Sequence, residues 1–222
     1  MPRAKRIPSS YTKPDFSRRP RHREPYDRVL IVCEGMTEKI YFEGLVYSLG
    51  LSCANIRISP SNKGTDPIQV VRYGIALAKE AHREGDAFQR LYCVFDLDRP
   101  HQDALDLAGK TKLPKTSLQL ATSNPCFEIW LRLHFGYTDK SYSAVGTKTA
   151  CQSVGDDLIA LAPHYSKGNA GLFRLFAHLV QDAVANSRKL ESNNRKTGNA
   201  NPSCTVHELA ADLLALKKDE RT

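Results

Sequence analysis

Short apolar runs alternate with amphipathic stretches over the first part of the chain. Runs rich in β-branched and aromatic residues predict four strands, over residues 29–33, 53–61, 90–98 and 116–125. Between them, apolar residues recur at helical spacing and predict helices over residues 37–50, 66–83 and 102–112. Strands that alternate with helices predict an α/β fold, with a parallel sheet and helices on both faces.

After Pro125 the pattern changes to helices joined by polar loops. Apolar positions at helical spacing predict helices over residues 126–136, 147–162 and 169–192, and a last helix from about Thr205. Thr205 and Glu208 have the spacing of a capping box. We therefore expect an α/β core over residues 27–126 and a C-terminal helical extension over 127–222 that packs on it.

Length and composition restrict the class of protein. The 222 residues suffice for one sizeable core, and no run approaches the roughly 18 apolar residues of a membrane span. The N-terminus lacks the apolar centre of a secretory signal, so we expect a cytoplasmic protein that does not bind membranes. The cysteines are scattered, with no zinc-finger spacing, and we expect reduced thiols that pack as small apolar groups.

Positive charge is concentrated at the N-terminus. The formal net charge is +8, and residues 1–24 hold eight basic and two acidic groups, a surplus of 8 − 2 = 6. With five prolines and few large apolar residues, residues 1–26 are predicted to form an extended or disordered basic arm. Such an arm attracts nucleic acid through counterion release, although a solubilising tail has the same composition. The nucleic-acid contacts that we expect there are Arg18, Arg19, Arg21 and Arg23.

Acidic residues follow the predicted strands where each one ends. Glu34 follows the first strand, Asp96 and Asp98 end the third, and Glu128 lies just past the fourth. Ligands of an open parallel sheet bind at this edge, and side chains two apart on a strand share a face. Close carboxylates repel unless they share a proton or bind a hard cation, so Mg²⁺ or Mn²⁺ is the expected cofactor. Glu34 either completes this metal site or acts as a general acid/base. The alternative for each motif is a solvated turn.

Three stretches together resemble the RloB-like family, whose core is similar to the Toprim domain of topoisomerases, primases and OLD-type nucleases. They read VLIVCEGMTEKIYF, VFDLD and SNPCFEIWLRLHF, and the similarity extends to NPSCTVHEL near the C-terminus. The resemblance implies a Toprim-like Rossmannoid sheet over residues 27–126 and a Mg²⁺-dependent phosphoryl-transfer site. By this analogy Glu34 is the general acid/base, Asp96 and Asp98 hold the metal, and Glu128 is a further ligand or orienting group.

Other residues have weaker signals. Lys39 and Lys167 are candidates for phosphate contact, and Trp130 is expected in the core rather than stacked on a base. His101 either reaches a phosphate or lies on a surface loop, and the glycine of NKGTDP lacks the spacing of a phosphate-binding loop. Four basic residues near the C-terminus either extend a nucleic-acid surface or are simply solvated: Arg188, Lys189, Arg195 and Lys196.

The leading hypothesis is a metal-dependent Toprim-type nuclease that cleaves DNA or RNA, with nucleic acid as its partner. The association of the resembled family with restriction and phage-defence loci implies a role in defence, with a protein partner or a homo-oligomer as possible assemblies. A second hypothesis is a non-catalytic nucleic-acid-binding or regulatory subunit with a cation-binding acidic site. A nucleotide-binding module is disfavoured because neither GxGxxG nor GxxxxGK[ST] occurs.

Overall fold

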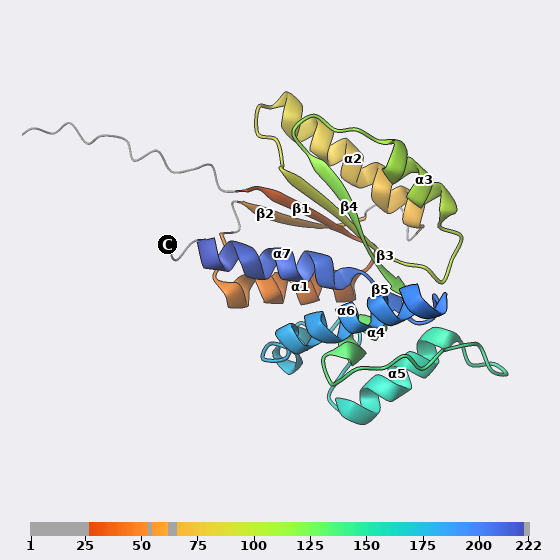
Figure 1. Ribbon diagram of the computed structural model, residues 1–222. Helices are drawn as coiled ribbons and strands as arrows, with labels where there is room; N and C mark the ends of the chain where they lie inside the picture. The colour runs from red at the N-terminus through yellow and green to blue at the C-terminus, as the bar shows by residue number, and fades with distance from the viewer. Residues whose placement is uncertain (1–26, 53–54, 62–65, 220–222) are drawn as a thin grey trace, which may run out of the picture.

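A five-stranded sheet forms the centre of the protein (Figure 1). The structure is a computed structural model that describes residues 27–52, 55–61 and 66–219. In the spatial order β2-β1-β3-β4-β5, the first four strands are parallel and β5 runs antiparallel to β4. The strands are β1 (Val29–Cys33), β2 (Ile56–Pro60), β3 (Arg90–Asp96), β4 (Ser117–Asn124) and β5 (Ser203–Cys204). The predicted α/β class with a mainly parallel sheet is confirmed.

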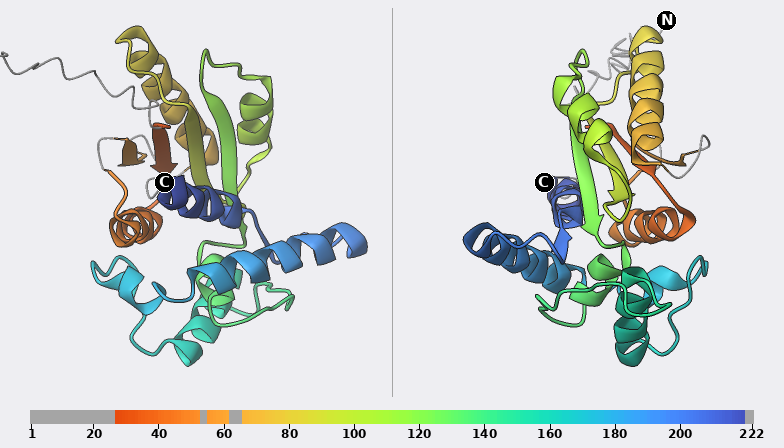
Figure 2. Two further views of the ribbon diagram at one scale, coloured as in Figure 1. Left: turned by 60° about the vertical axis from the view of Figure 1, so that its left-hand side comes forward. Right: turned by 90° about the vertical axis from the view of Figure 1, so that its right-hand side faces the viewer.

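Helices cover both faces of the sheet, because its strands are apolar on both sides. Leu30 and Val32 of β1 face α2 (Pro67–Arg83) and α3 (Gln102–Lys110), while Val29 and Ile31 face the opposite cluster. That opposite face is covered by α1 (Met36–Leu49) and α7 (Val206–Asp219), as Figures 1 and 2 show. Among the described helices, none is long and apolar enough to span a membrane.

A helical layer lies beyond the carboxyl ends of the parallel strands (Figure 2). It consists of α4 (Glu128–Leu133), α5 (Ala150–Leu161), the short 3₁₀ helix η1 (Leu172–Leu175) and α6 (Val180–Thr197). Its apolar side chains belong to the same buried cluster as those of α1 and α7. The helical layer therefore closes over the edge of the sheet where the acidic residues were expected.

The single helix predicted over residues 169–192 is wrong, because the segment forms η1 and then α6. Phe173 packs so closely on Gly44 of α1 that a Cβ at Gly44 would lie 2.3 Å from the Phe173 Cβ. This docking turns the chain before α6 begins. Helix α6 also runs beyond the predicted end at residue 192, since it continues to Thr197 and is capped by Gly198, with a φ of 70°.

The C-terminal segment returns to the sheet instead of staying in the helical layer. After α6 the chain adds β5 beside β4, where Ser123 pairs with Cys204. The Thr205 hydroxyl accepts a hydrogen bond from the Thr122 N–H at 2.8 Å, which ties the start of α7 to β4. A two-residue strand has no sequence periodicity, so β5 was not foreseen. The division into a core over 27–126 and an extension over 127–222 stays a prediction.

Candidate metal and nuclease site

The strands β1 and β3 bring Glu34 and Asp96 together at the carboxyl edge of the sheet. Glu34 follows β1, and its N–H donates to the Val94 carbonyl at 2.9 Å, so the chain stays paired one residue beyond the strand. Its carboxylate oxygen Oε2 accepts a hydrogen bond from the Asp96 N–H at 3.0 Å. The predicted proximity of these two residues is therefore present as a direct contact.

Asp98 lies beyond the end of β3. The strand was expected to run to residue 98 but ends at Asp96, and residues 97–99 form a bend. The bend begins where the Leu97 N–H donates to the Ser123 carbonyl at 2.8 Å. The exposed Asp98 carboxylate accepts from the Cys151 thiol at 3.9 Å. Its position is thus set by this bend and by α5, rather than by strand alternation.

Glu128 is the first residue of α4 and is 2% exposed. Its Oε1 accepts a hydrogen bond from the Tyr165 hydroxyl at 2.9 Å and lies 2.6 Å from the Lys167 Nζ. Burial is the largest single influence on the pKa of Lys167 and lowers it, but the hydrogen bond to Glu128 and the negative charge of Glu128, with smaller contributions from Cys126 and Cys151, together raise that pKa overall. Lys167 is therefore held at the site as the partner of a buried carboxylate, with its side chain 66% exposed.

Glu38 is a carboxylate of this site that the sequence reasoning missed. It lies in the first turn of α1, where an acidic residue usually faces solvent, yet it is 7% exposed. Burial, together with the charges of Glu34 and Glu128, raises its pKa from 4.5 to about 7. The spacing of Glu34 and Glu38, four residues apart across the strand exit, was the signal available in the sequence.

Five carboxylate side chains at this edge of the sheet repel one another when charged. We call them the acidic cluster: Glu34, Glu38, Asp96, Asp98 and Glu128. Burial raises the pKa of Asp96 well above its ordinary value, and the charges of Glu38, Glu34, Glu128 and Asp98 raise it further. Burial and the charge of Asp98 raise the pKa of Glu34, while its hydrogen bond from Asp96 opposes the increase. These raised pKa values show that burial and mutual repulsion oppose charging of the carboxyl groups together.

The donor chemistry of the acidic cluster fits a hard divalent cation, because every ligand it offers is a carboxylate oxygen. A bound cation would also offset the repulsion that raises the pKa of Asp96. Within the described part of the chain, however, no three His, Cys, Asp or Glu side chains converge closely enough to hold one ion as they stand. Cation binding therefore requires the carboxylates to move together.

The remaining candidates are dispersed or outside the described residues. Lys39 pairs with Glu43 on its own helix at 3.1 Å. His101 contacts the Arg99 carbonyl through Nδ1 at 2.8 Å, and Trp130 is fully buried, as the core interpretation predicted. Outside the described residues lie the four arm arginines, Arg18, Arg19, Arg21 and Arg23, and residues 62–65 of the NKGTDP segment.

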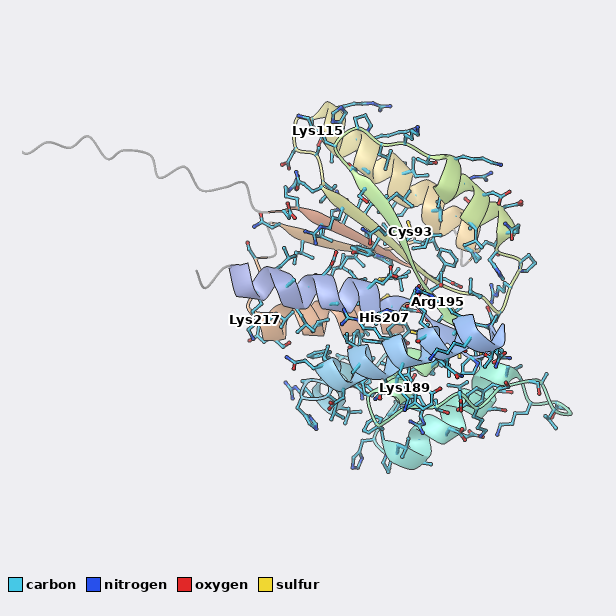
Figure 3. The ribbon with its side chains drawn as sticks, in the orientation of Figure 1. Cys93, Lys115, Lys189, Arg195, His207 and Lys217 are labelled. Carbon is cyan, nitrogen blue, oxygen red and sulfur yellow. The ribbon has the colours of Figure 1, made fainter. Side chains whose placement is uncertain are left out.

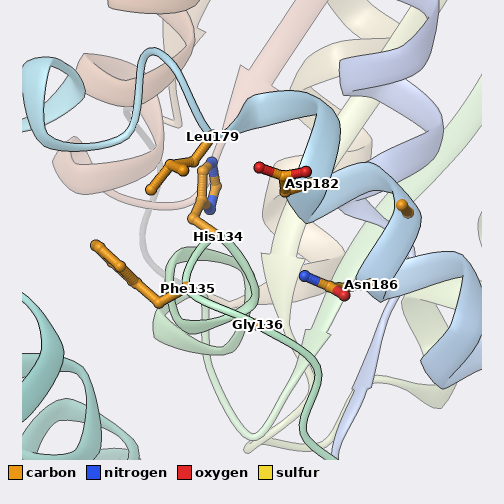
Figure 4. Close-up of a pocket in the computed structure, with 7 residues that line it drawn as sticks. His134, Phe135, Gly136, Leu179, Asp182 and Asn186 are labelled. Carbon is orange, nitrogen blue, oxygen red and sulfur yellow. The ribbon is translucent and has the colours of Figure 1, made fainter.

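The C-terminal basic residues lie on α6, where Figure 3 labels Lys189 and Arg195. Lys189 places its Nζ 4.2 Å from the centre of the Tyr137 ring, and Arg195 pairs with Glu191 one turn earlier. A hollow of about 420 Å³ opens between the end of α4 and the start of α6 (Figure 4). It is lined by His134, Phe135, Gly136, Leu179, Asp182, Ala185 and Asn186. Because no member of the acidic cluster lines it, this hollow is separate from the candidate site.

Comparison with known proteins gives one match, to a family. The family described as RloB-like protein matches residues 29–213, which include the whole acidic cluster and Lys167. No curated protein and no solved structure matches the chain.

Proposed function

The chain belongs to the RloB-like family, and from this premise we propose that it is a metal-dependent nuclease of the Toprim type. Its substrate is nucleic acid, either DNA or RNA, and its reaction is hydrolysis of phosphodiester bonds. We place this activity in the cytoplasm, in defence against phage.

One observation carries the proposal: the acidic cluster lies at the carboxyl edge of a parallel sheet, with Asp96 at its centre. Ligand sites of open α/β sheets form at this edge. The pKa of Asp96 is raised by burial and by the other carboxylates, and perturbed titration in a cluster of this kind is typical of functional sites. A structural role offers no gain from gathering so many acids.

The surroundings of each residue in the acidic cluster indicate its role in the proposed reaction. Asp96 and Asp98 would hold Mg²⁺ or Mn²⁺, with Glu38 and Glu128 as additional oxygen donors. A bound divalent cation neutralises phosphate charge and lowers the pKa of water. Glu34 accepts or returns a proton as general acid/base, because the Asp96 N–H fixes its carboxylate and its raised pKa suits proton exchange closer to neutrality.

Basic side chains of the protein would bind the phosphate backbone of the substrate. Lys167 is 66% exposed although it is paired with Glu128, so its ammonium group can donate to a phosphate oxygen as well. The arm over residues 1–26 adds charge that increases the local concentration of a polyanion. Lys39, which pairs with Glu43, is a weaker candidate for such a contact.

The test is cleavage of single- and double-stranded DNA, and of RNA, by the full chain with Mg²⁺, Mn²⁺ or EDTA. Asp96→Asn and Glu34→Gln keep the shape of their side chains and remove one charge each. We expect both to lose cleavage, whereas Asp106→Asn, on the exposed face of α3, keeps it. Cleavage at the wild-type rate by Asp96→Asn and Glu34→Gln would contradict the assignment of the site.

A binding subunit without turnover is the second candidate. It is favoured by the observation that no three potential ligands converge within the described residues. In that case the protein binds nucleic acid with a cation-dependent affinity but cleaves none of the substrates.

A further inference from the structure

A buried hydroxyl at the carboxyl edge of the sheet has no hydrogen-bond partner among the described residues. It belongs to Ser123, which lies one residue before the end of β4 and is 1% exposed. A hydroxyl can both donate and accept, so burying one without a partner is unfavourable. Because most buried polar groups in folded proteins are hydrogen-bonded, this exception calls for a physical reason.

The sheet places Ser123 beside Asp96. Strand β4 lies between β3 and β5 (Figure 1), and Ser123 is paired in register with Asp96 on one side and with Cys204 on the other. Residues paired in register point to the same face, and neighbouring strands are about 4.8 Å apart. This face is the one covered by α1 and α7, because Val94 and Ala121, two residues earlier on each strand, belong to the buried cluster on that side.

Of the three residues that flank Ser123 on this face of the sheet, Asp96 offers the strongest acceptor. Ala121 has no polar side-chain atom, and the thiol of Cys204 accepts only weakly. The Ser123 carbonyl accepts from the Leu97 N–H at 2.8 Å, which fixes β4 against the residue that follows Asp96. Because both side chains are short and start from neighbouring strands, rotation about their own χ angles is enough to bring hydroxyl and carboxylate together, with the strands unmoved.

We propose that Ser123 is a positioning residue of the metal site, whose hydroxyl donates to one oxygen of Asp96 while the other oxygen binds a divalent cation. This inference rests on the proposed metal-dependent function. Because no three potential ligands among the described residues converge as they stand, Asp96 has to turn toward an incoming cation. A neutral donor holds the turned carboxylate without competing for its charge, as a lysine would. Groups that hold a ligating carboxylate in this way are a regular part of metal sites.

Two other members of the acidic cluster are already held by a donor. The Glu128 carboxylate accepts from the Tyr165 hydroxyl at 2.9 Å, and the Glu34 carboxylate accepts from the Asp96 N–H at 3.0 Å. In each case one oxygen is occupied by a neutral donor. Ser123 supplies the same kind of donor for the carboxylate of Asp96 itself, which would explain why a buried hydroxyl is kept at this position of β4.

The test compares Ser123→Ala with the wild type in the full chain, by urea denaturation in EDTA and by calorimetric titration with Mn²⁺. Without metal, the variant should unfold at the wild-type urea concentration or above it, because alanine removes a hydroxyl that has no partner. Its affinity for Mn²⁺ should fall roughly 10-fold or more. Ser187→Ala is the matched control, since Ser187 is 0% exposed and its hydroxyl donates to the Cys204 carbonyl at 3.0 Å. This control should unfold at a lower urea concentration and keep the wild-type affinity, as Ser123→Ala would if Ser123 were merely structural.

The outcomes separate this inference from the proposed function. Wild-type Mn²⁺ affinity in Ser123→Ala would overturn the positioning role, while cleavage by the wild type would still support the nuclease. Weaker Mn²⁺ binding by Ser123→Ala, with no cleavage by the wild type, would support the positioning role and contradict the nuclease. Absence of Mn²⁺ binding by the wild type would overturn both. In crystals grown with Mn²⁺ we expect the Ser123 Oγ at about 2.5 to 3.0 Å from an Asp96 oxygen, and an Oγ bound to the cation itself would refute the positioning role.

Discussion

The carboxylate of Glu34 and the backbone N–H of Asp96 are joined by a hydrogen bond of 3.0 Å. The acid that follows β1 is therefore fixed to the acid that ends β3, across the parallel pairing in which Cys33 lies opposite Val94. The bond orients one Glu34 oxygen and opposes the increase in its pKa that burial produces.

Two replacements of Glu34 distinguish the effect of its charge from the effect of its hydrogen bond. Glu34→Gln keeps an oxygen that accepts from the Asp96 N–H, so we expect the free energy of unfolding to change by less than about 1 kcal/mol. Because a proton-transfer group contributes typically 10²–10⁴-fold, the cleavage rate should fall by at least about 10²-fold. Glu34→Ala should lose both cleavage and stability. Cleavage assays measure the rate, and urea denaturation measures the free energy of unfolding. If Glu34→Gln cleaved at the wild-type rate, Glu34 would have no role in proton transfer.

Glu38 makes the stability of the metal-free protein depend on pH. Its pKa is 4.5 ordinarily and about 7 in the folded protein, so the folded state holds a proton that the unfolded chain has lost between these values. The free energy of unfolding must then decrease as the pH rises through this window, by about 3 kcal/mol from Glu38 alone. Urea denaturation in EDTA at pH 5 and pH 8 measures this decrease.

A matched pair of variants assigns the pH effect to Glu38. Glu38→Gln should be clearly less sensitive to pH than the wild type, since an amide does not titrate. Glu43→Gln, one turn along the same helix and paired with Lys39, should keep the wild-type sensitivity. If the free energy of unfolding of both variants depended on pH as strongly as that of the wild type, the claim that burial disfavours the charged form of Glu38 would be contradicted.

Tyr165 stabilises the buried carboxylate of Glu128. Tyr165→Phe removes a hydrogen bond of 2.9 Å to a group that is 2% exposed, and we expect it to cost about 2 kcal/mol of unfolding free energy. Tyr137→Phe, which removes a solvent-exposed hydrogen bond from the partly buried Tyr137 to Asp139, should cost much less. Thermal and urea denaturation of the two variants give this comparison, and equal losses would argue against a special role for Tyr165.

The basic arm should determine the salt dependence of nucleic-acid binding. Deleting residues 1–26 removes a surplus of six positive charges. If most of them contact phosphates, the slope of log affinity against log salt should become shallower by about 4 to 5. Fluorescence anisotropy with labelled DNA and RNA between low and physiological salt measures the slope. An unchanged slope would identify the arm as a solubilising tail, and unchanged cleavage at low salt would show that the site is intact without it.

The fold was largely predictable because β1, β3 and their following helices have strong local patterns. Val29–Cys33 is apolar on both sides, as a central parallel strand must be, and the helix that follows has regular apolar spacing. The division of residues 169–192 was not predictable, because the contact of Phe173 with Gly44 lies outside the segment itself. Local periodicity does not report where a tertiary contact interrupts a helix.

The site was predictable only where backbone topology determines proximity. Glu34 and Asp96 follow neighbouring parallel strands, so their contact follows from the sheet alone. Glu38 was missed because an acid in the first turn of a helix usually indicates a solvated helix start.

The most direct test of the acidic cluster is a crystal structure of the protein grown with Mn²⁺, using the anomalous signal of the metal. We predict a peak at the carboxyl edge of the sheet, with oxygens of Asp96 and at least one other member of the acidic cluster at about 2.0 to 2.6 Å. Glu38 should lose its proton on binding, because the cation offsets the repulsion between the carboxylates. Mn²⁺ bound elsewhere, with the acidic cluster empty and its side chains unmoved, would contradict the proposed metal site and with it the nuclease.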